Sequence, residues 1–131
     1  QMQRANLVHN VSAITGACLA VEKNKFFQIN GFDSINLEVA FNDVDFCLRL
    51  MEQGYKNLFT PEATLYHHES KSRGQEDTPD KKQRFEREIN YMLERWSKSL
   101  LSDPNYNPNL SLDWQEQFHL AFPPRKSIFM S

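Results

Sequence analysis

Apolar positions recur with a helical period in the middle of the chain. From Val44 to Gln53 they are separated by three and four residues, and Gly54 follows, so this segment is predicted to be a helix. Asn42 or Asp43 is the expected cap at its start, because both side chains accept hydrogen bonds from free backbone N–H groups.

The longest predicted helix begins after Thr78 and runs to about Lys98. Thr78 is a suitable cap, and Pro79 suits the first helical position, whose N–H has no partner within a helix. The apolar positions of this segment fall on one stripe at helical spacing. The stripe consists of Phe85, Ile89, Met92, Leu93 and Trp96.

Strands are predicted on either side of the middle helix. The segment from Val11 to Val21 has the length and composition of a buried strand, interrupted by Gly16. The stretches "YKNLFT" and "ATLYHH" predict two short strands around Pro61. Between the first strand and the middle helix, "EKNKFFQING" predicts a short helix. Its inward side chains are expected to be Phe26, Phe27 and Ile29.

The order of these elements indicates an α/β fragment with too few strands for a complete doubly wound sheet. The polar stretch "ESKSRGQED" is expected to be a loop, and the chain beyond Leu101 is rich in Asn and Pro. We therefore expect residues 1–101 to form the domain and residues 102–131 to be a C-terminal extension.

Composition narrows the function classes. The 131 residues carry a net charge of −2, with 24% charged and 40% hydrophobic residues, which is ordinary for a soluble globular chain and argues against a nucleic-acid binder. No apolar run approaches the roughly 18 residues that span a bilayer. The start, "QMQRANLVHN", lacks a signal-peptide core and an initiator Met, so we expect a piece of a longer protein. Cys18 and Cys47 lie in apolar segments and are expected to be buried and unpaired, which fits a reducing compartment.

The paired carboxylates Asp43 and Asp45 have two interpretations. At a helix start they satisfy free N–H groups and the helix dipole, which needs no further function. Alternatively, one of them is a catalytic or ligand-binding carboxylate. Asp43 and Asp45 are two positions apart, and in a helix such residues lie about 200° apart around the axis, so both cannot face one ligand. A single functional carboxylate is therefore favoured over a matched pair.

Two other clusters have both a structural and a functional interpretation. In a strand, His67 and His68 would point to opposite faces, so one of them could bind a metal or a phosphate, or be a hydrogen-bonded structural residue. The hydroxyls and cations of residues 70–73, beside Gly74, suit an anionic ligand or a solvated loop. Gly16 marks a bulge, a close backbone approach or a tight packing contact.

Four stretches, in this order, resemble the C-terminal half of the catalytic domain of family 2 glycosyltransferases, which have the GT-A fold. They are "TGACLAVEKNKFFQINGFD", "VAFNDVDFCLRLMEQGY", "LFTPEATLYHHESKSRG" and "FEREINYMLERW". The resemblance covers roughly Val11 to Asn109 and is strongest to rhamnosyltransferase-like and polysaccharide-building members. Each stretch alone is a weak signal, and their order and spacing make it specific.

The resemblance implies a role for several residues. The "ED" or "ND" motif of the family matches Asn42-Asp43, so Asp43 is the expected catalytic base of an inverting transfer. The acceptor side is implied to include Thr15, Gly16, Ala17 and Asn42, with Asp45 beside them as the helix cap. The metal ligand is implied at His67, with His68 as a second candidate. A loop over the nucleotide diphosphate is implied at Ser70, Ser72 and Arg73.

The resemblance also implies what is missing and what would bind. The family's N-terminal half, with the DxD motif that holds Mg²⁺ or Mn²⁺, has no counterpart here, so this chain alone is expected to be inactive. The full-length enzyme is expected to take a nucleotide-diphospho-sugar donor and a glycan or lipid-linked acceptor in cell-surface polysaccharide synthesis. A cytoplasmic location is implied, including the inner face of the membrane, with self-association through an exposed sheet face.

Two alternatives stay open. The first is a non-catalytic module of the same fold that binds a protein or a glycan through its aromatic residues. The second is a small metal-dependent hydrolase built from Asp43, Asp45, His67 and His68, which requires all four side chains to converge.

Overall fold

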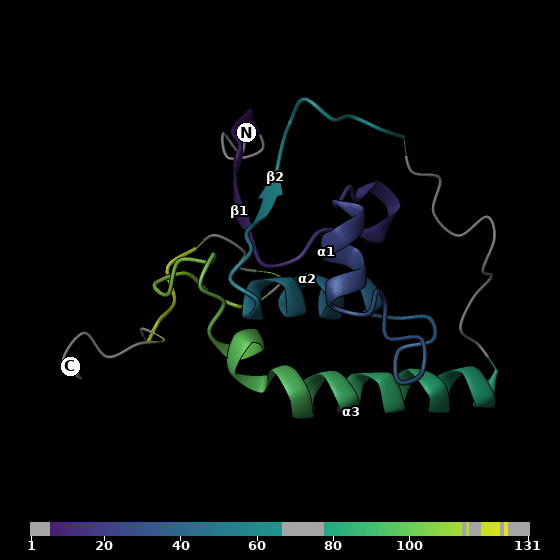
Figure 1. Ribbon diagram of the computed structural model, residues 1–131. Coiled ribbons are helices and arrows are strands. Elements are labelled where there is room, and N and C mark those ends of the chain that lie inside the picture. Colours follow the sequence, from purple (N-terminus) through teal and green to yellow (C-terminus); the bar gives the residue numbers. More distant parts are fainter. Residues whose placement is uncertain (1–5, 67–77, 114, 116–118, 124, 126–131) are drawn as a thin grey trace.

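The computed structural model describes residues 6–66, 78–113, 115, 119–123 and 125. Helix α2 lies between two layers: α3 on one side, and α1 with a small sheet on the other (Figure 1). The architecture is mixed helix and a two-stranded sheet, compatible with part of an α/β domain. The elements in chain order are β1 (His9–Val11), the 3₁₀ turn η2 (Gly16–Cys18), α1 (Lys23–Gln28), α2 (Asn42–Glu52), β2 (Asn57–Phe59) and α3 (Pro79–Leu101).

Helix α2 is confirmed, but the predicted cap is wrong. Phe41 is the N-cap residue, with a φ of 62° and no side-chain cap hydrogen bond. Asn42 and Asp43 already belong to the first turn, because the first helical hydrogen bond runs from the Asp45 N–H to the Phe41 carbonyl at 2.9 Å. At the other end the N–H of Gly54, whose φ is 82°, donates to Met51 as predicted for a glycine stop.

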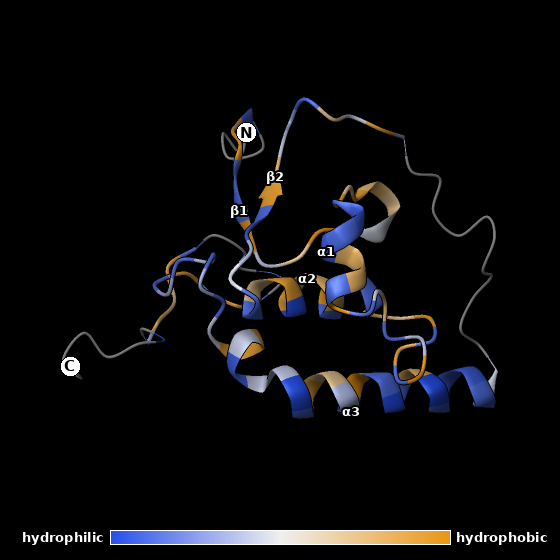
Figure 2. Ribbon diagram, in the orientation of Figure 1, coloured by the Kyte–Doolittle hydropathy of each residue, from blue (hydrophilic) through white to orange (hydrophobic). Residues whose placement is uncertain are grey.

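Helix α3 begins as predicted, with the Thr78 hydroxyl accepting from the Lys81 N–H and Pro79 in the first turn. It is hydrophilic over most of its length (Figure 2). Its buried row is Glu88, Met92 and Trp96, one residue every four. The predicted stripe is correct at Met92 and Trp96 and wrong at two other positions. Phe85 and Leu93 lie beside the buried row and are exposed.

The predicted strand from Val11 to Val21 is wrong. Strand β1 ends at Val11 and pairs antiparallel with β2, with His9 opposite Phe59. The chain then turns through η2, where the Thr15 hydroxyl accepts from the Ala17 N–H. The second strand predicted in "ATLYHH" is also absent from residues 63–66, which carry no regular structure, and the rest of that stretch lies outside the described residues.

The core consists of two clusters on opposite sides of α2. Leu37 and Leu48 pack against Met92 and Trp96 of α3. On the other side Ile29 packs with two residues of α2, Phe46 and Leu50. Phe26 of α1 joins this second cluster as predicted, whereas Phe27, predicted to point inward, is exposed.

Cys18 and Cys47 are both free thiols, as expected, and Cys47 is buried. Cys18, predicted to be buried, is exposed because it lies at the end of η2. In the described part of the chain, no helix combines the length and the apolar character needed to cross a membrane.

Candidate functional site

Asp43 lies against a segment that is distant in sequence. One of its carboxylate oxygens accepts the backbone N–H of Gly16 at 2.8 Å, across 27 residues of chain. A Cβ on Gly16 would lie 3.4 Å from the Asp43 Cβ, which is van der Waals contact, so Gly16 lies directly against the Asp43 side chain. The other oxygen accepts the Val44 N–H at 2.9 Å. The first turn of α2, where backbone dipoles favour negative charge, thus presents Asp43 to the residues after β1.

The predicted acceptor-side residues lie around this contact. Thr15, Gly16 and Ala17 are exposed, and Asn42 and Asp43 are half-buried at the start of α2. Their proximity brings together two segments that the sequence analysis identified separately. The arrangement is an ionisable carboxylate beside an exposed, tightly turned backbone.

Asp45 faces away from this site. It is fully buried, and its oxygens accept from the Arg49 Nε at 2.7 Å and from the Trp96 Nε1 at 2.9 Å. The predicted angular separation of the two carboxylates is therefore confirmed. Its assignment as the helix cap is wrong, because its side chain points into the α2–α3 interface and both oxygens have partners there.

Arg49 extends the contacts of Asp45 to the turn after α1. Its guanidinium donates to the carbonyls of Ile29 at 2.5 Å and of Gly31 at 2.6 Å. Position 31 of this turn accepts only glycine without strain: Gly31 has a φ of 63°, and a Cβ there would lie 2.7 Å from the ring of Phe26. One arginine thus joins the buried carboxylate to a backbone turn that requires glycine.

The sequence analysis missed Arg49 and the role of Trp96. Two signals could have identified them. Asp45 and Arg49 stand four residues apart on a predicted helix, which is the spacing of an ion pair. Trp96 was assigned to the core, and a buried indole N–H needs an acceptor.

The sequence analysis also missed Glu88. Its side chain is 2% exposed, and its two oxygens accept the backbone N–H groups of Val39 at 3.1 Å and Ala40 at 2.9 Å. The available signal was a glutamate four residues before Met92 in the buried row of an amphipathic helix. A buried carboxylate has to be satisfied, and here two backbone amides and the Arg84 guanidinium, 3.8 Å from one oxygen, satisfy it.

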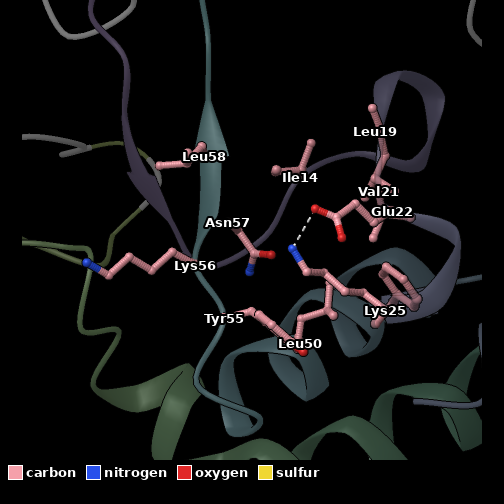
Figure 3. A pocket seen from close by; sticks show the side chains of 12 residues that line it. Ile14, Leu19, Val21, Glu22, Lys25, Leu50, Tyr55, Lys56, Asn57 and Leu58 are labelled. Carbon is pink, nitrogen blue, oxygen red and sulfur yellow. Dashed lines mark hydrogen bonds and ion pairs between the residues drawn. The ribbon is translucent and has the colours of Figure 1, made fainter. Parts of the chain in front are cut away.

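A separate groove of about 360 Å³ lies between the segment after η2 and strand β2. Leu19 and Val21 face β2 across it, with Leu50 and Tyr55 along its floor (Figure 3). Two of its charged residues pair with each other: the Lys25 ammonium lies 2.9 Å from Glu22, and it also lies 5.1 Å from the ring centroid of Tyr55. Asp43 does not line this groove.

The predicted metal and diphosphate residues lie outside the described part of the chain. They are His67, His68, Ser70, Ser72 and Arg73. Within the described ranges, no three His, Cys, Asp or Glu side chains come together as a metal site. Burial raises the pKa of the Cys47 thiol, which keeps it protonated and unsuited as a ligand or a nucleophile.

Comparison with known proteins supplies two matches over most of the chain. The chain is 48% identical over 120 residues to uncharacterized protein y4gI of Sinorhizobium fredii, which covers 92% of this chain and 13% of that protein. It is 33% identical over 103 residues to the O-antigen biosynthesis protein RfbC of Myxococcus xanthus, or 79% of this chain and 8% of that protein.

A third relative carries an enzyme name. The N-acetylglucosaminyl-diphospho-decaprenol L-rhamnosyltransferase of Mycobacterium tuberculosis is 33% identical over 66 residues, or 50% of this chain and 21% of that protein. The chain thus spans only a small part of each relative's length. No family model and no solved structure matches the chain. The chain is therefore similar to a small part of a protein named for O-antigen biosynthesis and of a protein named as a rhamnosyltransferase.

Proposed function

We propose that this chain is the acceptor-binding, base-bearing half of a family 2 glycosyltransferase domain with the GT-A fold. The observation that supports the proposal is the hydrogen bond from the Gly16 N–H to Asp43. It joins the two segments that the resemblance assigns to the acceptor side and to the catalytic base. The names of the relatives agree with a sugar transfer of this kind.

In this proposal Asp43 is the general base of an inverting transfer. Its carboxylate takes the proton of the acceptor hydroxyl while that oxygen bonds to the anomeric carbon of the donor sugar. The bond from that carbon to the diphosphate breaks on the opposite face, and its electron pair leaves with the nucleoside diphosphate. Gly16 holds one carboxylate oxygen in place through its N–H. Thr15, Ala17 and Asn42 border the acceptor.

The cation and the diphosphate loop remain part of the proposal for the full-length enzyme. Mg²⁺ or Mn²⁺ would supply charge neutralisation for the leaving diphosphate. The described residues alone do not fit such a site, because they bring no three candidate ligands together. We therefore assign no step to the cation here. His67 is proposed as a ligand, and Ser70, Ser72 and Arg73 as the loop over the diphosphate.

We further propose that the donor-binding half lies in the remainder of a longer protein. The relatives extend far beyond the matched region, which is 13%, 8% and 21% of their lengths. The sheet side of the chain has exposed apolar surface beside extended backbone, which a further strand would cover. Leu19 and Glu22 have extended backbones, and Leu58 across the groove is 55% exposed. A further strand in this groove would bury that apolar surface.

The decisive test is Asp43→Asn in the full-length protein, assayed with UDP- and dTDP-sugars. The amide keeps the shape and removes the base, so turnover should fall by about 10²- to 10⁴-fold. Asp80→Asn is the matched control, because Asp80 is also an acid in the first turn of a helix and is exposed. Wild-type turnover in the Asp43 variant contradicts the assignment. Glycan binding without transfer by the wild type favours the non-catalytic module.

A further inference from the structure

The two amides held by Glu88 lie immediately before the start of α2. Val39 and Ala40 donate to its two oxygens, and Phe41, the next residue, is the N-cap of the helix. Glu88 is far away in sequence, 49 residues from Val39, and is almost completely enclosed. One carboxylate of α3 therefore fixes two consecutive peptide groups at the point where the chain enters α2.

The chain needs to be held at this point. Phe41 has a φ of 62°, a left-handed conformation that a bulky residue adopts only when its surroundings impose it. Its ring stacks on Phe85 of α3, with 5.6 Å between the ring centroids. Phe85 lies one helical turn before Glu88. Helix α3 thus holds the turn twice, by an aromatic contact at Phe41 and by hydrogen bonds at Val39 and Ala40.

The direction in which Asp43 points depends on this turn. Asp43 is the second residue of α2, and α2 has no side-chain cap that would fix its first turn independently. A small rotation of that turn would move the carboxylate away from the Gly16 N–H, which it meets at 2.8 Å. The hydrogen bonds at Val39 and Ala40 set the path of the chain four and three residues before Asp43.

We propose that Glu88 is a positioning residue for Asp43. By holding the amides of Val39 and Ala40 it sets the start of α2, and with it the placement of the Asp43 carboxylate against Gly16. Its catalytic consequence rests on the function proposed above, whereas its effect on the geometry of Asp43 does not. Glu88 itself touches neither Asp43 nor Gly16, so it acts only through the turn.

A purely structural role is the alternative to exclude, and Met92→Ala provides the matched control. Met92 lies one turn further along the buried row of α3 and packs with Leu37, Leu48 and Trp96. Its truncation weakens the same helix interface and leaves the Glu88 hydrogen bonds in place. Comparing Glu88→Ala with Met92→Ala at equal global stability, adjusted with urea, therefore isolates positioning from folding.

The first measurement is residue-resolved amide hydrogen exchange in the full-length protein. In Glu88→Ala we expect exchange at Val39, Ala40 and Gly16 to rise by about tenfold or more over the control, because charge-assisted hydrogen bonds are lost locally. Glu88→Gln should show a smaller rise, since its amide keeps one acceptor oxygen. Equal Gly16 exchange in the Glu88→Ala and Met92→Ala proteins overturns the proposal.

The second measurement is steady-state kinetics of the same variants. A displaced base lowers the rate without weakening substrate binding, so kcat should fall by about 10- to 100-fold in Glu88→Ala with KM changed less than about twofold. Met92→Ala, at equal folded fraction, should keep its kcat. Equal kcat losses in these two variants overturn the proposal. A wild-type protein without transfer activity instead contradicts the proposed function, and the exchange experiment then decides the role of Glu88 alone.

Discussion

The two sides of α2 differ in how completely they are packed. Toward α3, Asp45 and Leu48 are enclosed by Trp96 and Met92, and the polar atoms of Asp45 have partners. Toward the sheet, β1 and β2 are three residues each, and Leu58 is 55% exposed beside the groove. Two short strands cannot bury an apolar face by themselves. Both sides of α2 thus contain a buried cluster, and the sheet side in addition presents exposed apolar surface for further structure.

Both sides of α2 also have side chains that hold distant backbone in place. On the α3 side, Glu88 binds two amides before α2. On the other side, Arg49 binds the carbonyls of Ile29 and Gly31, and Asn57 donates to the carbonyls of Ser12 and Cys47. Asp43, the proposed base, lies on α2, which packs against α3, and its carboxylate faces Gly16 in the segment after β1.

Asp45→Ala should have the largest effect on stability. The substitution leaves the guanidinium of Arg49 and the indole N–H of Trp96 without their buried acceptor, and breaking a buried pair costs about 3–5 kcal/mol. Urea denaturation of the chain measures the change. Glu52→Ala, at the exposed end of the same helix, is the control and should stay within about 0.5 kcal/mol. A loss below about 1 kcal/mol for Asp45→Ala would show that the α3 side does not depend on this network.

The parts of the fold that the sequence predicted are those fixed by local rules. The start of α3 follows from Thr78 and Pro79, and the end of α2 follows from Gly54. Neither depends on a partner elsewhere in the chain. The position of Asp43 and Asp45 on different faces of α2 also followed from helix geometry alone.

The errors come from tertiary contacts that the local pattern does not contain. The apolar run from Val11 to Val21 has the composition of a strand, but Asp43, 27 residues from Gly16, binds the Gly16 N–H where the chain turns. The start of α2 was misplaced because Phe41 has a left-handed conformation and Glu88, 48 residues away from Ala40, holds the chain just before it. The site itself was predicted through resemblance, and the residues that support it were not.

Asp33 gives a pH-dependent test of the α3 side, with an intermediate effect. Burial by itself would raise the pKa of this carboxyl, but hydrogen bonds from Asn36, Tyr91 and Ile35 outweigh it and lower the pKa from 3.8 to about 2. The Tyr91 hydroxyl donates at 2.8 Å and ties the loop after α1 to α3. Because the folded pKa lies below the unfolded one, this stabilisation is present above pH 3.8 and is lost as the pH falls through about 2.

Asp33→Asn should therefore be less stable than the wild type at pH 6 by about 1 kcal/mol, a value reduced for the partial exposure of the group. The difference should shrink as the pH falls from 4 toward 2, and urea titrations at several pH values would follow it. Tyr91→Phe, which removes one of the hydrogen bonds, should show a smaller difference with the same trend. A difference that is constant with pH would mean that the Asp33 charge does not contribute.

Leu58→Lys should have the smallest effect on stability and tests the sheet side. Leu58 is 55% exposed, so the free energy of unfolding should change by no more than about 0.5 kcal/mol. Leu93→Lys is the matched control, because Leu93 is 51% exposed but lies on α3. If the open sheet face drives the proposed self-association of this chain, sedimentation velocity should show the Leu58 variant as smaller species and the Leu93 variant unchanged. Equal behaviour of the two variants would remove the distinction between the sides of α2, since both surfaces would then be ordinary exposed surface.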